Sequence, residues 1–501
     1  MNFKLYSCAV VLFLAQGAAV HAQPLPPRDE FFWLGEMNKA SAVINTDEGL
    51  LDKGLAPRLA AGVARVLADG NQVGGRRPST VITFEPLLIQ AAGPEVTLLH
   101  AGRSSQDMHA TYRAAILRED LLKLAEQLNK TSGALVAMAA RHVKTVVPNY
   151  TNGVAAQPNS LGHYLLGHAA GLDRDAQRIR EAYVRIDRSP MGTTVLNGTS
   201  WPLNRVRMAD YLGFASTVEN AYDAAQISSS EHPVEVGSIV VSIALHTGNF
   251  VEDVMTQYAN AKPWMLLAEG GGNTYVSSAM PQKSNPGVLN STRRDASTAL
   301  SLALGPMLRA HNIPPGMADA KEVRDNSAMV RSAAGVLQSW ERILAALIVN
   351  PQRALDELNS DWTASQELAD VLMRKYKLPF RVGHHFASQV VEYAKANEIK
   401  PLDFPYAEAR RIYRESVKEG GVGGELPMSE AEFRSTLNPV AIVNNRTTAG
   451  GPQPAEMERM LGLAQRRIAE QGEWIAARRA RIDGSLAKLD ADFDKLLKTG
   501  R

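Results

Sequence analysis

Cysteine is almost missing from this sequence, since the 501 residues contain a single one, Cys8. Cys8 lies within a segment that we predict to be removed as a secretory signal, so the mature chain would hold no thiol. That prediction excludes disulfides, a thiolate nucleophile and a cysteine-ligated metal site. A protein exported without disulfides must be stabilised by its hydrophobic core, which suits a large helical protein.

Residues 1–22 have the features of a secretory signal. Lys4 supplies a basic start, residues 8–15 form an apolar core, and residues 20–22 place small side chains before a cleavage point that we assign after Ala22. The apolar run is too short to span a bilayer. The sequence therefore predicts a periplasmic or secreted protein with no membrane contact after cleavage, and the alternative is a buried N-terminal helix.

Aromatic residues are also scarce, and neither sign of charge is in large excess. Phe, Trp and Tyr make up 6% of the chain, and 54 Lys+Arg against 52 Asp+Glu leave a net charge of +2. A balanced charge provides no electrostatic basis for binding nucleic acid or an anionic membrane. The 45% hydrophobic content, rich in Ala and Leu, instead indicates a globular and mostly helical chain.

Four segments have the spacing of long amphipathic helices. The first apolar stripe consists of Leu117, Leu121, Leu124, Leu128, Leu135 and Met138. The second consists of Ile239, Ile243, His246, Phe250 and Val254, with His246 assigned to the core. Segments 291–308 and 333–347 complete a predicted bundle of near-parallel helices. Strand signals are limited to residues 79–84 and 195–196, and residues 70–78 and 420–427 are predicted loops.

Residues 269–286 form the segment with the clearest chemical character. Three consecutive glycines at 270–272 precede a polar loop with serines, a lysine and an asparagine, and a helix follows from about Leu289. The glycines provide hinge freedom, and the N–H groups at the start of a helix favour anions. Such a loop can close over a carboxylate, but composition alone fits an ordinary anchored loop equally well.

The order of residues in this loop resembles the signature of the fumarase/aspartase superfamily. The similar stretch reads Ser277-Ser278-Ala279-Met280-Pro281-Gln282-Lys283-Ser284-Asn285-Pro286. Further segments resemble the argininosuccinate lyase branch, namely residues 100–107, 148–151, 157–158, 162–166, 197–205, 212–214 and 445–451. The resemblance extends from about His100 to Leu463.

The resemblance implies a mainly α, three-domain subunit whose central long-helix bundle forms a homotetrameric 20-helix core with active sites shared between subunits. We expect a small N-terminal helical domain at 23–118, a central helical bundle at 119–360 and a C-terminal helical domain at 361–501. The implied reaction is anti elimination from a succinyl compound, a dicarboxylate, to give fumarate and an amine or alcohol. It needs no cofactor and no metal.

Individual residue roles also follow from the resemblance. Removing a proton beside a carboxylate produces an aci-carboxylate, whose extra negative charge the site must stabilise. Ser277 would be the base, and its alkoxide requires loop N–H groups and a cation, for which Lys283 is the candidate. The implied substrate-binding residues are Ser104, Ser105, Gln106, Thr151, Asn152, Gln157, Asn285 and Lys321. Without the resemblance, Lys283 would be a solvated loop lysine, and Thr151 and Gln106 polar residues at helix ends.

Two positions depart from the argininosuccinate lyase pattern. Asn152 stands where the family has a histidine that acts in proton transfer to the leaving group, and Asn290 where it has the paired glutamate. Asparagine forms hydrogen bonds but does not titrate at neutral pH. Either His163, Tyr150 or His100 protonates the leaving group of a different substrate, or catalysis is lost and binding is kept. The retained serine and lysine of the loop favour the first interpretation, although His163 is more simply a hydrogen-bonded core histidine.

The substrate-binding positions differ as well. Residues 105–107 are more similar to the carboxymuconate-lactonizing enzymes of the superfamily than to argininosuccinate lyases. Aligning on Lys321 places Ile313 and Ala318 where the family binds the amino-acid end of argininosuccinate, and an apolar pair does not hold a guanidinium-bearing amino acid. Three hypotheses remain: an exported lyase for an N-substituted aspartate, a cycloisomerase, and a catalytically silent dicarboxylate-binding homologue.

Overall fold

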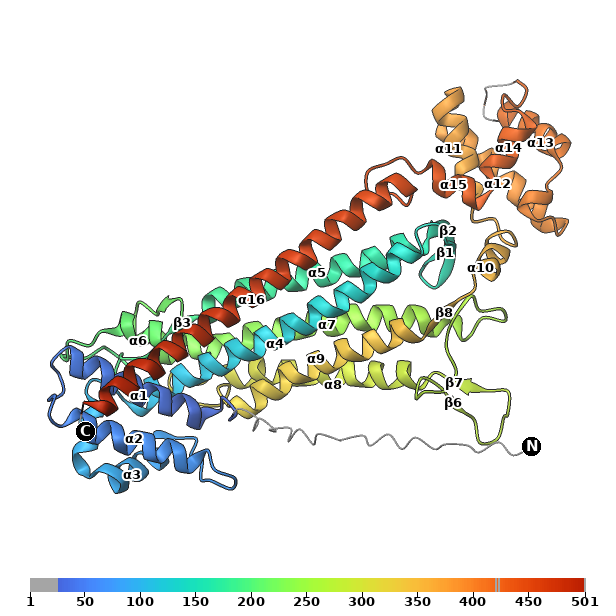
Figure 1. Cartoon of the computed structure of the whole chain (residues 1–501). Helices are drawn as coiled ribbons and strands as arrows, with labels where there is room; N and C mark the ends of the chain where they lie inside the picture. Colours follow the sequence, from blue (N-terminus) through green and yellow to red (C-terminus); the bar gives the residue numbers. More distant parts are fainter. Residues whose placement is uncertain (1–25, 420, 422–423, 500–501) are drawn as a thin grey trace, which may run out of the picture.

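The computed structural model describes residues 26–419, 421 and 424–499, so the predicted signal segment and part of the predicted 420–427 loop lie outside the described residues. Long helices form an elongated bundle, with a group of shorter helices at each end (Figure 1). The long helices are α4 (Ser105–Arg141), α5 (Leu161–Ile186), α7 (Ser228–Gln257), α8 (Gly287–Ala310), α9 (Val323–Ala346) and α16 (Pro454–Lys498). The mainly α prediction and the four predicted bundle helices are confirmed.

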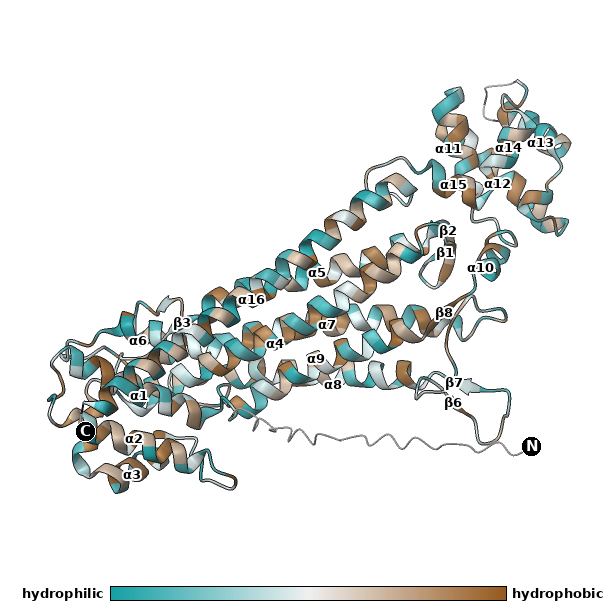
Figure 2. Ribbon diagram, viewed as in Figure 1, coloured by the Kyte–Doolittle hydropathy of each residue, from teal (hydrophilic) through white to brown (hydrophobic). Residues whose placement is uncertain are grey.

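The bundle is held by the faces that the sequence predicts to be apolar. All six residues of the first stripe are buried on α4, which packs against α5 and α9. Hydrophobic and hydrophilic residues alternate around these helices (Figure 2), as expected for helices with one buried face. The assignment of His246 to the core is wrong in part. Its side chain is half-buried, and its Nδ1 lies 2.7 Å from Asp175 Oδ2.

Helices α1 (Glu30–Asp47), α2 (Ala56–Gly70) and α3 (Val81–Ala92) and the 3-10 helix η1 (Pro94–His100) pack at one end of the bundle. The strand predicted at 79–84 is wrong. Thr80 caps α3, its hydroxyl accepting the backbone N–H of Thr83 at 3.4 Å, while Val81, Phe84 and Leu88 are buried. A short apolar run fits a strand or a helix, and here the cap and the packing against α2 select the helix.

A second hydrophobic core lies at the other end of the bundle and includes Phe386, Phe404 and Phe433. It is built mainly from α11 (Ser365–Tyr376), α12 (Phe380–Ala396), η3 (Pro401–Asp403), α13 (Tyr406–Glu419) and α14 (Glu430–Thr436). Helices α10 (Pro351–Leu358) and α15 (Pro439–Asn445) connect this group to the body. The predicted boundary between residues 118 and 119 falls within α4, which is continuous across it.

Short strand pairs connect the helices. Strands β1 (Val146–Thr151) and β2 (Val154–Ser160) form an antiparallel hairpin that the sequence analysis missed. The remaining pairs are β3 (Arg188–Ser189) with β4 (Ser216–Thr217), β5 (Met265–Leu267) with β8 (Leu347–Val349), and β6 (Tyr275–Val276) with β7 (Ser284–Asn285). The strand predicted at 195–196 is wrong, because Thr194 and Val195 have positive φ angles of 47° and 71°. Between β3 and α7 lie α6 (Arg205–Tyr211) and the π-helical turn η2 (Asp223–Ile227).

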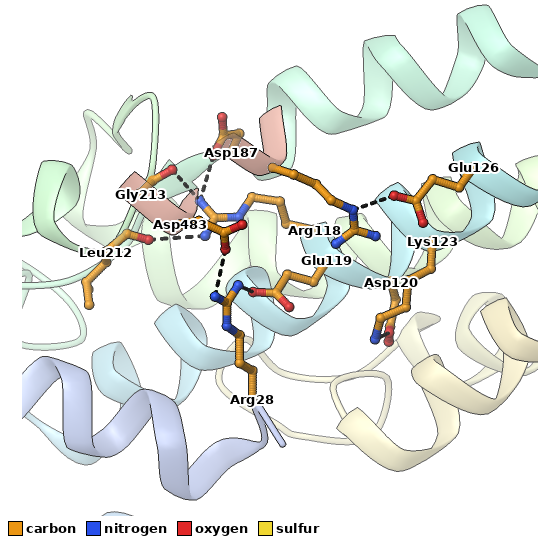
Figure 3. A network of polar contacts seen from close by, with 11 residues as sticks. Arg28, Arg118, Glu119, Asp120, Lys123, Glu126, Asp187, Leu212, Gly213 and Asp483 are labelled. Carbon is orange, nitrogen blue, oxygen red and sulfur yellow. Dashed lines mark hydrogen bonds and ion pairs between the residues drawn. The ribbon is translucent and has the colours of Figure 1, made fainter. Parts of the chain in front are cut away.

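A buried arginine joins α4 to the segments that follow α5. The guanidinium of Arg118 donates to Asp187 Oδ1 at 2.8 Å and to the carbonyl oxygens of Gly213 and Leu212 at 2.9 and 3.1 Å (Figure 3). Its carbon also lies 4.1 Å from the ring centroid of Phe214. A buried charge is tolerated when it is paired and hydrogen-bonded in this way.

The segment Asp223–Gln257 is long and apolar enough to cross a membrane by length and composition. Half of its most apolar window is buried inside the bundle, against α8, α5 and α9. A single helix of this kind is weak evidence for a membrane span, because a packed core helix passes the same test.

Candidate active site

The loop with the superfamily signature is a hairpin that precedes α8. Strands β6 and β7 pair Tyr275 with Asn285 and Val276 with Ser284. The three glycines before it have φ angles of 79°, 59° and 78°, a left-handed conformation that residues with a side chain adopt only under strain. Asn273 ties the hairpin to the helix, because its carbonyl oxygen accepts the N–H of Val288 at 3.0 Å. The three glycines at 270–272, which the sequence predicts to be a hinge, therefore form a left-handed turn that leads into this hairpin.

Ser277 lies at the start of the hairpin loop, and its hydroxyl oxygen is the centre of a small hydrogen-bonding site. The backbone N–H groups of Ala279 and Met280 both donate to Ser277 Oγ at 3.3 Å. Its own N–H donates to the carbonyl oxygen of Lys283 at 2.9 Å, which closes the loop. Two N–H donors aimed at one oxygen stabilise negative charge on it, as an alkoxide base requires.

Lys283 and Asn285 lie on the returning side of the same hairpin. Lys283 is exposed, and its side chain forms no hydrogen bond or ion pair within the described part of the chain. Asn285 is half-buried, and its Nδ2 donates weakly to the carbonyl oxygen of Tyr275 at 3.4 Å. The loop therefore presents a serine, a lysine and an amide from one short segment.

Thr151 and Asn152 lie at the tip of the β1–β2 hairpin. Thr151 pairs with Val154, so the turn consists of Asn152 and Gly153, whose φ angles are 54° and 75°. Two successive positive φ angles define a type I′ turn, for which Asn-Gly is the favoured sequence. Asn152 is thus explained by the turn that it forms, whether or not it takes part in catalysis. The Asn-Gly pair is also the sequence signal that predicts this hairpin.

Three further candidate residues for substrate binding or proton transfer are Asn290, Tyr150 and Gln157. Asn290 lies in the first turn of α8 and has no hydrogen bond to Asn152 in the described part of the chain. The Tyr150 hydroxyl donates to Glu357 and accepts from Trp264 Nε1 at 3.0 Å, and burial raises its pKa to about 12. Gln157, also assigned to the substrate, is exposed and donates to Gln366 on α11.

The two histidines considered as acids have protein partners. His163 Nε2 lies 2.8 Å from the carbonyl oxygen of Gly450 and forms the expected hydrogen bond, although the ring is only half-buried. His100 Nδ1 lies 3.3 Å from Glu85 Oε2 at the opposite end of the bundle. Burial and the charge of Arg103 lower the pKa of His100.

Ser104, Ser105 and Gln106 begin α4 at the opposite end of the bundle from the hairpins (Figure 1). Ser104 caps the helix, accepting the N–H of Gln106 at 3.1 Å. Asp107 completes the capping box, and its second carboxylate oxygen accepts the N–H groups of Gly192, Thr193 and Thr194 at 3.1, 3.0 and 3.0 Å. Backbone N–H groups thus bond to both oxygens of this buried carboxylate. Asp107 therefore positions the neighbouring motif residues 104–106 and does not face a substrate.

Lys321 lies at that same end, buried near Arg113 of α4. Its Nζ donates to the carbonyl oxygen of Ala225 at 3.3 Å. Burial and the charge of Arg113 lower the pKa of Lys321 to about 8. Neither cation forms an ion pair with a described residue, so together they would attract an anion.

The candidate residues therefore fall into two groups that one chain does not bring together. Ser277, Lys283, Asn285 and the β1–β2 hairpin lie at one end of the bundle, and Gln106 and Lys321 at the other (Figure 1). Helix α4, whose 37 residues run from Ser105 to Arg141 between these two ends, is about 55 Å long. Among the described residues no group of His, Cys, Asp and Glu is arranged to hold a metal ion.

Comparison with known families gives this arrangement its context. A family described as Lyase matches residues 80–300, and one described as Argininosuccinate lyase C-terminal matches residues 362–444. Argininosuccinate lyase from Methanosarcina acetivorans is 26% identical over 463 residues, covering 92% of each chain. The chain is an argininosuccinate lyase-like member of the fumarase/aspartase superfamily.

Other relatives agree with this placement. Argininosuccinate lyase from Geobacillus kaustophilus is 28% identical over 431 residues, covering 84% of this chain and 89% of its own length. The crystal structure of EDDS lyase in complex with formate has a TM-score of 0.84 and 25% identity, covering 94% and 93% of the two chains. A 3-carboxy-cis,cis-muconate lactonizing enzyme from Pseudomonas putida, with a TM-score of 0.62 and 19% identity, shares the fold. As an argininosuccinate lyase-like protein, this chain is a carbon–nitrogen lyase.

Proposed function

We propose that this protein is an exported lyase that releases fumarate and an amine from an N-substituted aspartate by anti elimination. The observation that carries the proposal is the Ser277 hydroxyl, whose oxygen accepts two backbone N–H groups in the same loop as Lys283. A structure of an EDDS lyase variant with bound fumarate, at 25% identity and a TM-score of 0.84, supports fumarate as the product.

In this mechanism Ser277 removes the proton next to a substrate carboxylate. Lys283 and Asn285 stabilise the resulting aci-carboxylate, and Ser104, Ser105, Gln106 and Thr151 bind the succinyl unit. The carbon–nitrogen bond then breaks, and the electron pair leaves with the nitrogen. Asn152 cannot supply a proton, so the leaving nitrogen must either take its proton from another group or already carry it as an ammonium, in which case it departs as a neutral amine.

The charges around Lys321 favour a leaving amine that carries an anionic group. Lys321 and Arg113 are two cations without an acidic partner in the described chain, close to the start of α4. Ile313 and Ala318 provide no polar groups for a guanidinium. An amine with its own carboxylate matches this charge better than arginine does.

The separation of the two residue groups supports a homotetramer with shared active sites. A second copy running in the opposite direction would place the Gln106 end of one bundle beside the Ser277 end of another. Helix α8 carries exposed apolar side chains suited to such contacts, with Leu302, Leu304 and Leu308 at 38%, 43% and 75% exposure. Exposed apolar faces of this kind mark association surfaces.

The proposal is tested with the mature protein beginning at Gln23. It is incubated with argininosuccinate, aspartate and N-substituted aspartates, among them amines with additional carboxylates, while fumarate is followed by ultraviolet absorbance and products by mass spectrometry. We expect fumarate from a carboxylated amine, loss of turnover by at least about a hundredfold in Ser277→Ala, and normal turnover in Ser278→Ala. A product of unchanged mass would instead identify a cycloisomerase, and binding of succinyl compounds without turnover at any pH would contradict both enzymatic hypotheses.

A further inference from the structure

The loop before Lys321 is joined to two neighbouring segments through the buried side chain of Gln226. Gln226 Nε2 donates to the carbonyl oxygen of Val195 at 3.2 Å. A Cβ atom at Gly316 would lie 2.8 Å from Gln226 Oε1, so the loop passes close to Gln226 there. Lys321 Nζ donates to the carbonyl oxygen of Ala225 at 3.3 Å. Segments 192–196, 223–227 and 311–321 therefore form one structural unit.

This unit is fixed to the start of α4, where we place the succinyl end of the substrate. The Asp107 carboxylate accepts the three N–H groups of segment 192–194, and the Thr194 hydroxyl donates to the carbonyl oxygen of Gly102 at 3.0 Å. Asp107 follows Gln106 directly in the chain. The three segments consequently keep a fixed position relative to Gln106.

Each of the three segments exposes a large apolar side chain. The exposed fractions are 48% for Leu196, 38% for Ile227 and 48% for Met317. The segments also contain two acidic residues, Asp223 and Asp319, and neither forms an ion pair within the described part of the chain. Exposed apolar side chains on segments that meet at a buried cation favour a ligand with an apolar group beside a negative charge.

Arg113 supplies an accessible positive charge beside these segments. It follows Gln106 by seven residues, or two helical turns, so both side chains lie on one face of α4, about 10 Å apart along its axis. Arg113 is half-buried, and its guanidinium forms no hydrogen bond or ion pair with a described residue. Arg113, Lys321 and Ala224 line one small cavity. Lys321 is 2% exposed, so it adds positive charge and Arg113 is the group that a ligand can contact.

We propose that the leaving amine is an α-amino acid with an apolar side chain, and that Leu196, Ile227 and Met317 determine this specificity. The inference rests on the proposed lyase function and names its substrate class. The succinyl unit lies at Gln106, the carboxylate of the amino acid at Arg113, and its side chain against the apolar surface of the three segments.

The reaction with such a substrate balances without a further reactant. The substrate nitrogen is a secondary amine, which carries an additional proton as an ammonium at neutral pH. Ser277 takes the proton next to the substrate carboxylate, the carbon–nitrogen bond breaks, and its electron pair leaves with the nitrogen. The products are fumarate and a free amino acid whose amine departs neutral.

Three N-substituted aspartates test this specificity, with nitrogen substituents derived from leucine, asparagine and 3-methylbutylamine. Asparagine has nearly the shape of leucine but a polar side chain, and 3-methylbutylamine is leucine without its carboxylate. We measure kcat/KM of the full mature protein from fumarate absorbance. The leucine compound should exceed each of the other two by about tenfold, since each buried methylene contributes about fourfold to binding and the apolar surface stays partly open.

Variants assign the two preferences to residues. Met317→Gln keeps the length of the side chain, and we expect it to reduce the preference for leucine over asparagine about threefold or more. Arg113→Met should remove the preference for leucine over 3-methylbutylamine. The control Met373→Gln, at a methionine of α11 that is 43% exposed, should change neither preference. Size-exclusion chromatography follows the oligomeric state of each variant.

The outcomes separate this inference from the lyase function. Equal fumarate release from all three compounds would overturn the specificity and leave the lyase function standing. Release from other N-substituted aspartates but from none of these three would do the same. Release from no N-substituted aspartate would overturn the proposed function itself. A Met317→Gln variant that dissociates while its preference stays unchanged would show that the apolar surface contacts another subunit, which contradicts the assignment.

Discussion

The carboxylate of Asp107 accepts the backbone N–H of Thr194 at 3.0 Å, and so joins the start of α4 to a loop nearly ninety residues further along the chain. Thr194 and Val195 both have positive φ angles, a conformation that costs about 1–3 kcal/mol for residues with a side chain. The concave row of N–H groups from Gly192 to Thr194 binds the carboxylate and offsets that cost. Ser105 and Gln106 are therefore held in place by a residue that does not itself face a substrate.

Replacing Asp107 with asparagine should damage both stability and activity. An amide keeps one acceptor oxygen but turns an NH₂ group toward backbone N–H groups, so about 2–4 kcal/mol of unfolding free energy should be lost. We also expect a raised KM, because Gln106 loses its fixed position. Urea unfolding and steady-state kinetics measure the two effects, with the exposed Asp69→Asn as control. Full activity in Asp107→Asn would contradict the positioning role.

Mixing two inactive variants should restore activity if active sites are shared between subunits. Ser277→Ala inactivates one end of the bundle and Gln106→Ala the other, so a mixed oligomer contains some sites with both native residues. Random association of equal amounts should restore about a quarter of wild-type activity. The variants are unfolded together, refolded and assayed for fumarate, with each variant refolded alone as the control. A mixture as inactive as its components would show that Ser277 and Gln106 do not act in one site across subunits.

The buried pair of Arg118 and Asp187 should be sensitive to loss of one partner. Asp187→Ala leaves a buried guanidinium without its counter-ion, and we expect the unfolding free energy to fall by about 3–5 kcal/mol. The double change Arg118→Met with Asp187→Leu should recover much of that loss, because it removes both charges. The exposed pair of Arg185 and Glu235 is the control, where Glu235→Gln should cost less than about 1 kcal/mol. A small effect of Asp187→Ala in urea unfolding would contradict this account.

The pH dependence of substrate binding should report on Lys321. Its lowered pKa of about 8 means that the side chain is charged below that pH and neutral above it. For a leaving amine with a carboxylate, kcat/KM should decrease as the pH rises through about 8. Lys321→Arg keeps the charge and should remove this decrease, whereas Lys321→Met should lower kcat/KM at all pH values. An unchanged profile in Lys321→Arg would assign the titration to another group.

Three histidines, of which His232 is buried and His109 and His168 are half-buried, should make the protein sensitive to mild acid. Burial lowers the pKa values of His109, His168 and His232 to about 4, below the ordinary value of 6.5. Between these values the unfolded chain binds more protons than the folded one, so stability should fall as the pH drops from about 6.5 to 4. Each histidine contributes about 3 kcal/mol to this loss at most. Thermal unfolding of His168→Gln should show a shallower decline, and the exposed His311→Gln the wild-type decline.

Local sequence patterns predict an element correctly where a helix and a strand would need different spacings of the apolar residues. The stripe on α4 repeats over many turns, and no strand can bury side chains at that spacing, so the helix was predictable. The run at 79–84 is too short to distinguish the two periods, and a cap at Thr80 decided the outcome. The β1–β2 hairpin was signalled by Asn152-Gly153, whose turn chemistry is as specific as a helical stripe.

The sequence by itself determined the helical architecture, the family and the serine–lysine loop, because amphipathic period and motif order are properties of neighbouring residues. Only the tertiary structure decided which motif residues meet. It placed Gln106 and Ser277 at opposite ends of the bundle and gave the carboxylate of Asp107 to a distant backbone loop. Distances across a bundle depend on how whole helices pack, and no local pattern encodes them.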